Sequence, residues 1–240
     1  MNVFIYDTVT DKNRKTVRKF EEQINKLSLQ GKIIYLKDIK NPKEIIEKEV
    51  NNGAKTIIIL GNDETVNTLV NILANISQNI PIFVVPIGNK NNIANALGVK
   101  NEKEAPFILS ARRLERLNVG KINNEYFISN CHLRGSDINI SINNEFSVKT
   151  QKNSEHYIFN LLDINCSTQN NLVSPQDKIL NLVINTNSKD KTIVPIEGFL
   201  EIDQQEVDLI VDNSKIIKSP VKISSSEKFL HFIVGKDRSF

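Results

Sequence analysis

Residues 57–67 read Ile57-Ile58-Ile59-Leu60-Gly61-Asn62-Asp63-Glu64-Thr65-Val66-Asn67, an apolar run that ends in a polar turn and then resumes helical spacing. A second stretch of the same kind is Val84-Val85-Pro86-Ile87-Gly88-Asn89-Lys90-Asn91-Asn92. In α/β folds, a buried strand followed by a tight turn and a helix start exposes backbone N–H groups and the positive end of the helix dipole. Two such turns predict a nucleotide-binding edge at the carboxyl ends of neighbouring parallel strands.

The first half of the chain alternates strand patterns with helix patterns. Strands are expected at Val3–Tyr6, Lys32–Leu36, Lys55–Leu60 and Ile82–Val85, and helices at Lys15–Leu29, Pro42–Val50, Glu64–Ile76, Asn89–Leu97 and Glu102–Arg113. Alternation over this length favours a doubly wound parallel sheet with helices on both faces.

After Leu117 the helical period disappears, and short alternating segments follow, separated by turns rich in Asn, Asp and Ser. This pattern is typical of an antiparallel sandwich or barrel. We therefore expect an α/β N-terminal domain of nucleotide-binding type at residues 1–117. An all-β, sandwich-like C-terminal domain is expected at residues 118–240.

Composition narrows the classes of function. Of the 240 residues, 40% are apolar and 25% charged, which is ordinary for a soluble globular protein. No apolar run approaches the roughly 20 residues of a membrane helix, and the N-terminus lacks the pattern of a signal peptide, so a cytoplasmic protein is expected. A net charge of +3 is too small to indicate nucleic-acid binding. Cys131 and Cys166 are expected to be free thiols.

Several polar residues have a structural interpretation beside a functional one. Asn62 or Asp63 could simply cap a helix, and the asparagines of the second turn could be caps and turn formers. The densest basic cluster could bind phosphate or an anionic membrane surface, or could be a solvated helix end; it consists of Arg112, Arg113 and Arg116. The three histidines are expected to be structural, and they are His132, His156 and His231.

Together, the two turns resemble the catalytic domain of the diacylglycerol kinase family, lipid kinases related in fold to NAD kinases. The signature of that family is G-G-D-G-T-x-N after a strand, followed by P-x-G-T-x-N-D-x-A-x-x-L-G. This chain matches the signature at Gly61, Asp63, Thr65, Asn67, Pro86, Gly88, Asn91, Ala94, Leu97 and Gly98. In the second half, Val211-Asp212-Asn213-Ser214 looks like the family's D-G-E segment.

The resemblance implies an ATP-dependent transfer of the γ-phosphate to a lipid hydroxyl, assisted by magnesium, with ATP in a cleft between the two domains. It assigns catalytic roles to Asp63 and Asp212, and makes Asp63 the magnesium ligand. Contacts with the nucleotide are implied for Gly61, Asn62, Glu64, Thr65, Asn67, Gly88, Asn89, Asn91 and Asn92.

The chain also departs from the family's pattern. Asn62 and Glu64 occupy two glycine positions, where side chains should hinder a close approach of phosphate or a positive φ. The negative charge of Glu64 would either repel a triphosphate or become a magnesium ligand. The second turn has Asn89 and Asn92 in place of Thr and Asp, Ser214 replaces the Glu of D-G-E, and Tyr6–Asp11 stands where an N-P-x-x-G loop is usual.

These departures leave an alternative, a catalytically inactive pseudokinase that acts as a ligand-binding or scaffolding protein. A related kinase for a soluble substrate is a third hypothesis. The sequence leaves open whether the chain forms a homodimer or contacts a membrane peripherally.

Overall fold

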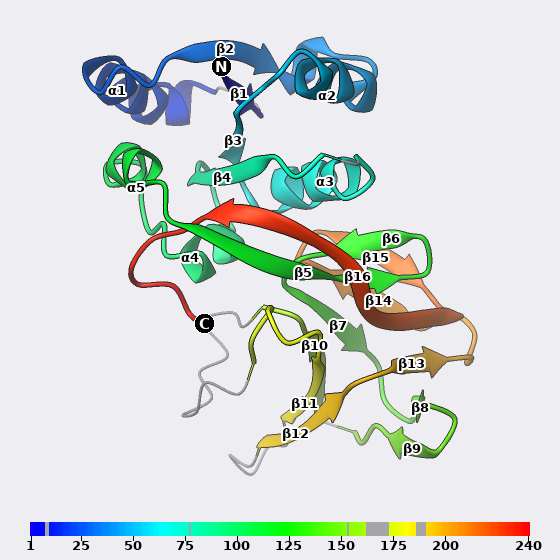
Figure 1. The fold of residues 1–240 in the computed structure, drawn as a ribbon. Helices are drawn as coiled ribbons and strands as arrows, with labels where there is room; N and C mark the ends of the chain where they lie inside the picture. Colours follow the sequence, from blue (N-terminus) through cyan, green and yellow to red (C-terminus); the bar gives the residue numbers. More distant parts are fainter. Residues whose placement is uncertain (8–9, 77, 153, 162–172, 186–190) are drawn as a thin grey trace. The chain divides into compact units, whose positions relative to one another are not determined.

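The computed structural model describes residues 1–7, 10–76, 78–152, 154–161, 173–185 and 191–240. The chain divides into two units (Figure 1). The first contains Met1–Leu117 and Leu230–Ser239, and the second contains Asn118–Phe229 and Phe240.

The first unit is an α/β structure. Its parallel strands lie in the order β2-β1-β3-β4, and they are β1 (Asn2–Tyr6), β2 (Gly31–Tyr35), β3 (Thr56–Gly61) and β4 (Pro81–Pro86). The helices are α1 (Asp11–Lys26), the 3-10 turn η1 (Leu36–Asp38), α2 (Pro42–Asn51), α3 (Asp63–Leu73), α4 (Asn92–Ala96) and α5 (Ala105–Ala111). Figure 1 shows α1 and α5 on one side of these strands, and α2 and α3 on the other. The predicted doubly wound sheet is confirmed.

Strand β3 forms the centre of this sheet because its side chains are buried on both faces. All six of its residues are buried, as expected for a β-branched run covered by two helix layers. Ile58 and Leu60 pack with Phe20 of α1 on one face, and the alternation of a strand directs Ile57 and Ile59 to the other. Burial of each such side chain stabilises the fold by about 1.5–3 kcal/mol.

Helix boundaries differ from the sequence expectations where turns decide them. Helix α1 begins at Asp11 and not at Lys15, because the Thr10 N–H donates to Asn13 Oδ1 over 2.7 Å and stabilises an earlier start. Helix α4 begins at Asn92 and not at Asn89, because Gly88 and Lys90 adopt positive φ and keep the preceding residues in a turn.

The second unit is built from strands only, within the residues that the structure describes. The strands β5 (Leu114–Ile122) and β16 (Val221–Ile233) each connect the two units. The others are β6 (Glu125–Phe127), β7 (Asn130–Arg134), β8 (Asn139–Ile142), β9 (Phe146–Lys149), β10 (Glu155–Phe159), β11 (Leu180–Asn185), β12 (Lys191–Ile196), β13 (Phe199–Ile202), β14 (Asp208–Val211) and β15 (Lys215–Lys218).

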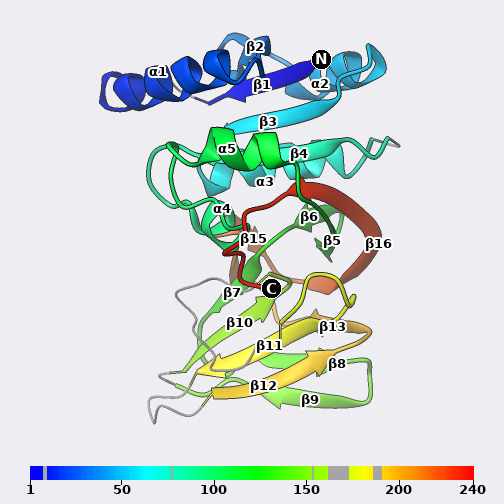
Figure 2. The same cartoon turned by 60° about the vertical axis from the view of Figure 1, so that its left-hand side comes forward.

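These strands form two antiparallel arrangements (Figure 2). One has the order β12-β11-β10-β7-β14-β15, and the other β16-β13-β8-β9. A single apolar core contains side chains from both, including Leu133 and Leu182 from the first and Ile140 and Leu200 from the second. The expectation of an all-β second half is therefore confirmed.

The end of the chain corrects one expected boundary. Residues 118–240 were assigned to the second domain, whereas Leu230–Ser239 belongs to the first unit. The reason is that His231 and Phe232, near the end of β16, pair in parallel with Pro81 and Ile82 of β4. Strand β16 thus adds to the sheet of the first unit.

The two cysteines were expected to be free thiols. Cys131 is free and buried, and its pKa lies well above the usual value because of burial and, secondarily, the charge of Asp212. Cys166 lies outside the described residues.

In the ranges that the structure covers, no helix combines the length and the apolar character that crossing a membrane requires.

The histidines of the second unit should make stability depend on pH. His132 stacks on Tyr157 with ring centroids 4.3 Å apart, and its pKa is lowered mainly by burial, while Glu155 opposes and Arg134 reinforces the shift. The pKa of His156 is also lowered, by burial and by His132. Folding then favours the neutral rings. Their contribution to the free energy of unfolding is therefore complete above the ordinary histidine pKa of about 6.5 and is lost as the pH falls below it.

We therefore expect the melting temperature to decrease between about pH 7 and pH 5, in the range where histidine titrates. His132→Phe, which keeps an aromatic ring against Tyr157, should reduce that decrease, and thermal melts across the pH range would measure it. An unchanged pH dependence in the variant would contradict this account.

Candidate functional site

Asp63, the first residue of α3, ties the two predicted turns together. Its backbone N–H donates to Lys90 O over 2.9 Å. Its carboxylate accepts the N–H of Asn92 over 3.1 Å and that of Ile93 over 3.0 Å. The residue is only 1% exposed. Because the first N–H groups of a helix lack partners within the helix, this carboxylate both stabilises the start of α4 and fixes the turn before it.

The turn between β3 and α3 requires a glycine at its first position. A Cβ on Gly61 would lie 2.6 Å from Thr65 Cβ and Oγ1, too close for any side chain. Asn62 caps the helix by accepting the Thr65 N–H over 3.1 Å, which confirms the capping interpretation of that residue. Thr65 Oγ1 donates to Asp7 Oδ2 over 2.8 Å and links the turn to the end of β1.

The two substituted glycine positions adopt ordinary backbone conformations. Asn62 has φ −100°, and Glu64 lies in the first turn of α3 without positive φ. The concern that these positions need a left-handed backbone therefore does not apply to this chain. Glu64 is exposed, whereas Thr65 and Asn67 are 5% and 4% exposed. The predicted hindrance to phosphate binding is therefore limited to the side chain and the charge of Glu64.

A polar cavity of about 430 Å³ opens beside the second turn. Its wall is formed by Thr10, Lys12, Asn13 and Thr16 of the α1 start, by Pro86, Gly88, Asn89 and Asn91 of the turn, and by Lys100, Asn101 and Glu102. Gly88 has φ +85°, and an added Cβ would meet nothing within 4 Å. Glycine is thus favoured there by backbone conformation and not by crowding.

Three of the residues predicted to contact a nucleotide, Gly88, Asn89 and Asn91, lie together on this wall. Asn91 Nδ2 donates to Gly88 O over 2.8 Å, whereas Asn91 Oδ1 is buried and has no hydrogen-bond partner among the described residues. Asp63 and Asn92 are absent from the wall, and their contacts hold the turn in place. The structure thus separates wall residues from residues that position them.

Sequence reasoning missed the contribution of α1. Lys12 is exposed on the cavity wall, and no carboxylate pairs with it in the part of the chain that the structure describes. The available signal was Thr10 followed three residues later by Asn13, a helix-start pattern. Helix α1 begins at Asp11, at the end of the segment Tyr6–Asp11 that stands in place of the family's N-P-x-x-G loop. Thr8 and Val9 of that segment lie outside the described residues.

Asp212, the other predicted catalytic residue, belongs to the second unit. It follows β14 with φ +46° and is completely buried. Its carboxylate accepts three backbone N–H groups, from Ile128 over 2.9 Å, Ser129 over 2.7 Å and Asn130 over 3.1 Å. This carboxylate therefore fixes the segment that leads into β7, and a catalytic role for it stays a prediction.

The implied magnesium ion would need oxygen ligands from the side chains at this turn. Mg²⁺ is usually held by one or two carboxylates together with water and substrate phosphates. The Asp63 carboxylate is buried and accepts two backbone N–H groups, and no cluster of three or more His, Cys, Asp or Glu side chains suited to a metal occurs in the described ranges. This arrangement fits a carboxylate that anchors a turn, and does not fit direct ligation.

Comparisons with known proteins place the two turns in the same family that their sequence resembles. A family model for the diacylglycerol kinase catalytic domain matches residues 3–122, which include β1, β3, β4 and both turns. The chain belongs to this family. The diacylglycerol kinase assignment in the sequence analysis is confirmed.

Individual relatives agree with the family assignment. A Staphylococcus haemolyticus protein whose name classes it among lipid kinases is 31% identical over 141 residues, 58% of this chain and 43% of that protein. A Bacillus subtilis diacylglycerol kinase is 34% identical over 76 residues, 30% of this chain and 25% of that enzyme. The aligned regions thus span less than half of these relatives. A diacylglycerol kinase structure from Bacillus anthracis superposes with a TM-score of 0.77 at 15% identity, covering 99% of this chain and 98% of that one, which shows the shared fold.

Asp63→Ala should destabilise this diacylglycerol kinase-type domain. The substitution leaves the buried N–H of Ile93 and the partly buried N–H of Asn92 without an acceptor, at about 1–3 kcal/mol each, so the free energy of unfolding should fall by about 2–6 kcal/mol. Asp63→Asn keeps one acceptor oxygen and should lose about half as much. Urea denaturation measures both values.

The control is Glu64→Ala, which removes an exposed acid from the same helical turn and should change stability by less than about 0.5 kcal/mol. Equal losses for Asp63→Ala and Glu64→Ala would contradict the anchoring role of Asp63.

Proposed function

We propose that this chain is an ATP-dependent lipid kinase and that the polar cavity beside the Gly88–Asn91 turn receives phosphate groups of ATP. Membership of the diacylglycerol kinase family supports the class of reaction. The observation that carries the proposal for the nucleotide is the cavity wall itself, where the predicted turn residues lie together with Lys12 and the start of α1.

The charges and donors of this wall suit a polyphosphate. Lys12 supplies an ammonium group without a carboxylate partner in the described structure, and the 16-residue helix α1 directs the positive end of its dipole to the same place. The Asn89 and Asn91 amides can donate to phosphate oxygens. A volume of about 430 Å³ lies within the range of small-molecule sites. Glu102 is the opposing charge on the wall.

Transfer of a phosphoryl group depends mainly on positioning and on electrostatic stabilisation. For Asp63 and Asp212 we propose positioning roles, because the hydrogen bonds of each carboxylate hold a backbone segment in place. The proposed acceptor is the hydroxyl of a lipid, as the family implies.

Nucleotide binding can be tested through thermal stability. ATP with Mg²⁺ should raise the melting temperature in a saturable manner, since a ligand that binds the native state stabilises it. Lys12→Ala removes a charge-assisted hydrogen bond and should weaken the apparent affinity by about tenfold. Lys26→Ala, an exposed lysine in the last turn of the same helix, is the matched control and should leave the affinity unchanged.

The absence of any shift at millimolar ATP would overturn the proposal. Binding without transfer of labelled γ-phosphate to diacylglycerol or another lipid would overturn the enzymatic part, and would favour the inactive ligand-binding alternative.

Glu64 should weaken the binding of ATP if the triphosphate follows the β3–α3 turn. Two like charges about 4 Å apart cost on the order of 4 kcal/mol at an effective dielectric near 20, and screening at this exposed position reduces the cost. Glu64→Gln should therefore strengthen ATP binding several-fold in the same thermal assay. Glu44→Gln, an exposed acid in the first turn of α2, is the control; unchanged or weaker binding in Glu64→Gln would contradict the obstruction.

A further inference from the structure

A further cavity of the first unit lies at the end of its sheet, between helix α1 and strand β2. Its volume is about 480 Å³, within the range of small-molecule sites. Residues of β1, α1 and β2 form its wall, and none of them lines the proposed nucleotide cavity. We call it the sheet-edge cavity.

The parallel pairing of β1 with β2 sets the floor of the sheet-edge cavity. Phe4 lies opposite Ile33, and Tyr6 lies opposite Tyr35, so these four side chains share one face of the sheet. Helix α1 covers the β1 pair, because Phe4 and Tyr6 are 3% and 2% exposed and pack in one core with Phe20. The β2 pair lies beyond that cover, and Ile33 and Tyr35 are 44% and 37% exposed.

One carboxylate, that of Glu21 on α1, lies on the wall of this cavity. Glu21 is half-buried, and its Oε1 accepts the Tyr6 hydroxyl over 2.9 Å. Burial and, secondarily, this hydrogen bond raise the pKa of Tyr6, so the phenol stays protonated and acts as the donor. A neutral phenol satisfies one oxygen of the carboxylate and leaves its negative charge uncompensated.

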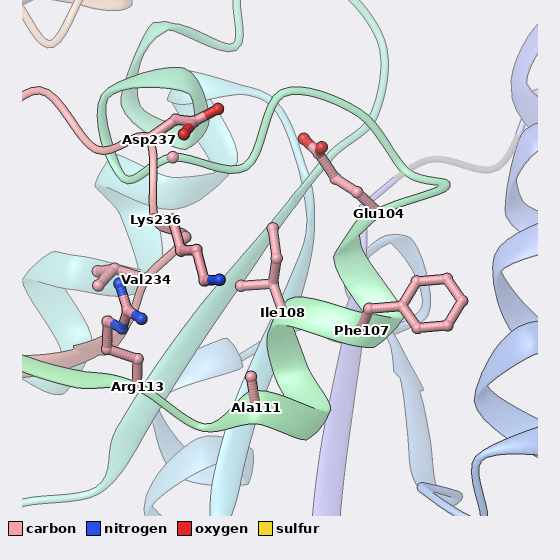
Figure 3. Close-up of a pocket in the computed structure, with 10 residues that line it drawn as sticks. Glu104, Phe107, Ile108, Ala111, Arg113, Val234, Lys236 and Asp237 are labelled. Atoms are coloured by element: carbon pink, nitrogen blue, oxygen red, sulfur yellow. The ribbon is translucent and has the colours of Figure 1, made fainter.

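No basic side chain lines the sheet-edge cavity among the residues that the structure describes. A cavity of about 330 Å³ between α5 and the residues that follow β16 differs in this respect (Figure 3). Its wall carries acids and bases together, namely Glu104, Asp237, Arg113 and Lys236. The charge on the wall of the sheet-edge cavity has a single sign, and a ligand of complementary charge is a cation.

We propose that the sheet-edge cavity binds a small organic cation, a protonated primary amine with an apolar portion. The ammonium group donates to Glu21 Oε2, the oxygen that the Tyr6 hydroxyl does not use, in a charge-assisted hydrogen bond. The apolar portion covers Ile33 and Tyr35, and the Tyr35 ring adds the attraction of an aromatic group for a cation.

Other classes of ligand fit this wall less well. A neutral ligand leaves the charge of Glu21 without a partner, and an anion is repelled by it. An inorganic cation would need several ligands, and the described ranges contain no cluster of three or more His, Cys, Asp or Glu side chains suited to a metal. It would also leave Ile33 and Tyr35 in water. The proposal is independent of kinase activity.

The experiment is equilibrium dialysis of radiolabelled 2-phenylethylamine, which carries an ammonium group at neutral pH, against the full chain without nucleotide. Binding should saturate and should raise the melting temperature. The neutral analogue 2-phenylethanol and the anion 3-phenylpropionate should compete at least about tenfold more weakly, since neither supplies a charge-assisted hydrogen bond to a carboxylate.

Substitutions on the wall test the two parts of the site separately. Glu21→Gln keeps an acceptor for the Tyr6 hydroxyl but removes the charge, and should weaken the binding of the amine by about tenfold. Tyr35→Ala should weaken it by about two- to fivefold, whereas Tyr35→Phe retains the ring and should bind as the parent does.

Matched controls separate this site from general charge and hydrophobicity. Glu22→Gln removes the next acid of α1, which pairs with Arg18 over 3.2 Å and does not line this cavity. Phe146→Ala removes an aromatic side chain that is 49% exposed in the second unit. Both controls should bind the amine as the parent does. Thermal melts without ligand establish that each variant is folded.

Several outcomes would overturn the amine site. They are equal binding of 2-phenylethanol, no saturable binding of the amine, or an equal loss of affinity in the control variants. Strand β2 lies at the edge of the sheet, where another strand can pair. Self-association of the parent in the ultracentrifuge that Tyr35→Ala abolishes, without any binding of the amine, would replace the site with an interface between copies of the chain.

Discussion

The constraint on which the first unit depends is the buried carboxylate of Asp63. Burial of a carboxyl group is costly unless the group is hydrogen-bonded, and the Asp63 carboxylate accepts the N–H groups of Asn92 and Ile93. The same contacts supply partners for the start of α4. The end of β3 and the turn after β4 are therefore held together, and the cavity wall at Gly88 and Asn91 depends on that connection.

Asp212 repeats the same physical solution in the second unit, where three backbone N–H groups surround a carboxylate with no exposure. Both aspartates of the family motif thus have a structural role that is independent of chemistry. This explains how a chain can retain the fold with Asn62 and Glu64 at glycine positions. Those two residues adopt ordinary backbone conformations, so their effect falls on the ligand and not on the architecture.

Local pairing of charges matters more in this protein than the net charge of +3. Glu104 and Asp237 accept from the backbone and side chain of Lys100 and its neighbour. Lys12 and the pair Arg113 and Lys236 line two different cavities without such partners. A nearly balanced composition therefore contains two separate cavities with cationic walls.

The sequence by itself determined the fold class, the family and the position of both turns. Apolar runs such as Ile57–Leu60, the glycines after them and the loss of helical period after Leu117 can be recognised along the chain, because the spacing of apolar residues and the conformational freedom of glycine are properties of the sequence itself. Only the tertiary structure decided that Asp63 anchors the second turn, that Lys12 joins its cavity wall and that Leu230–Ser239 returns to the first unit. These features depend on contacts between residues far apart in the chain, such as Lys100 with Asp237. Such partners are chosen by packing and by the need to satisfy buried polar groups, and neither is encoded in the spacing of a motif.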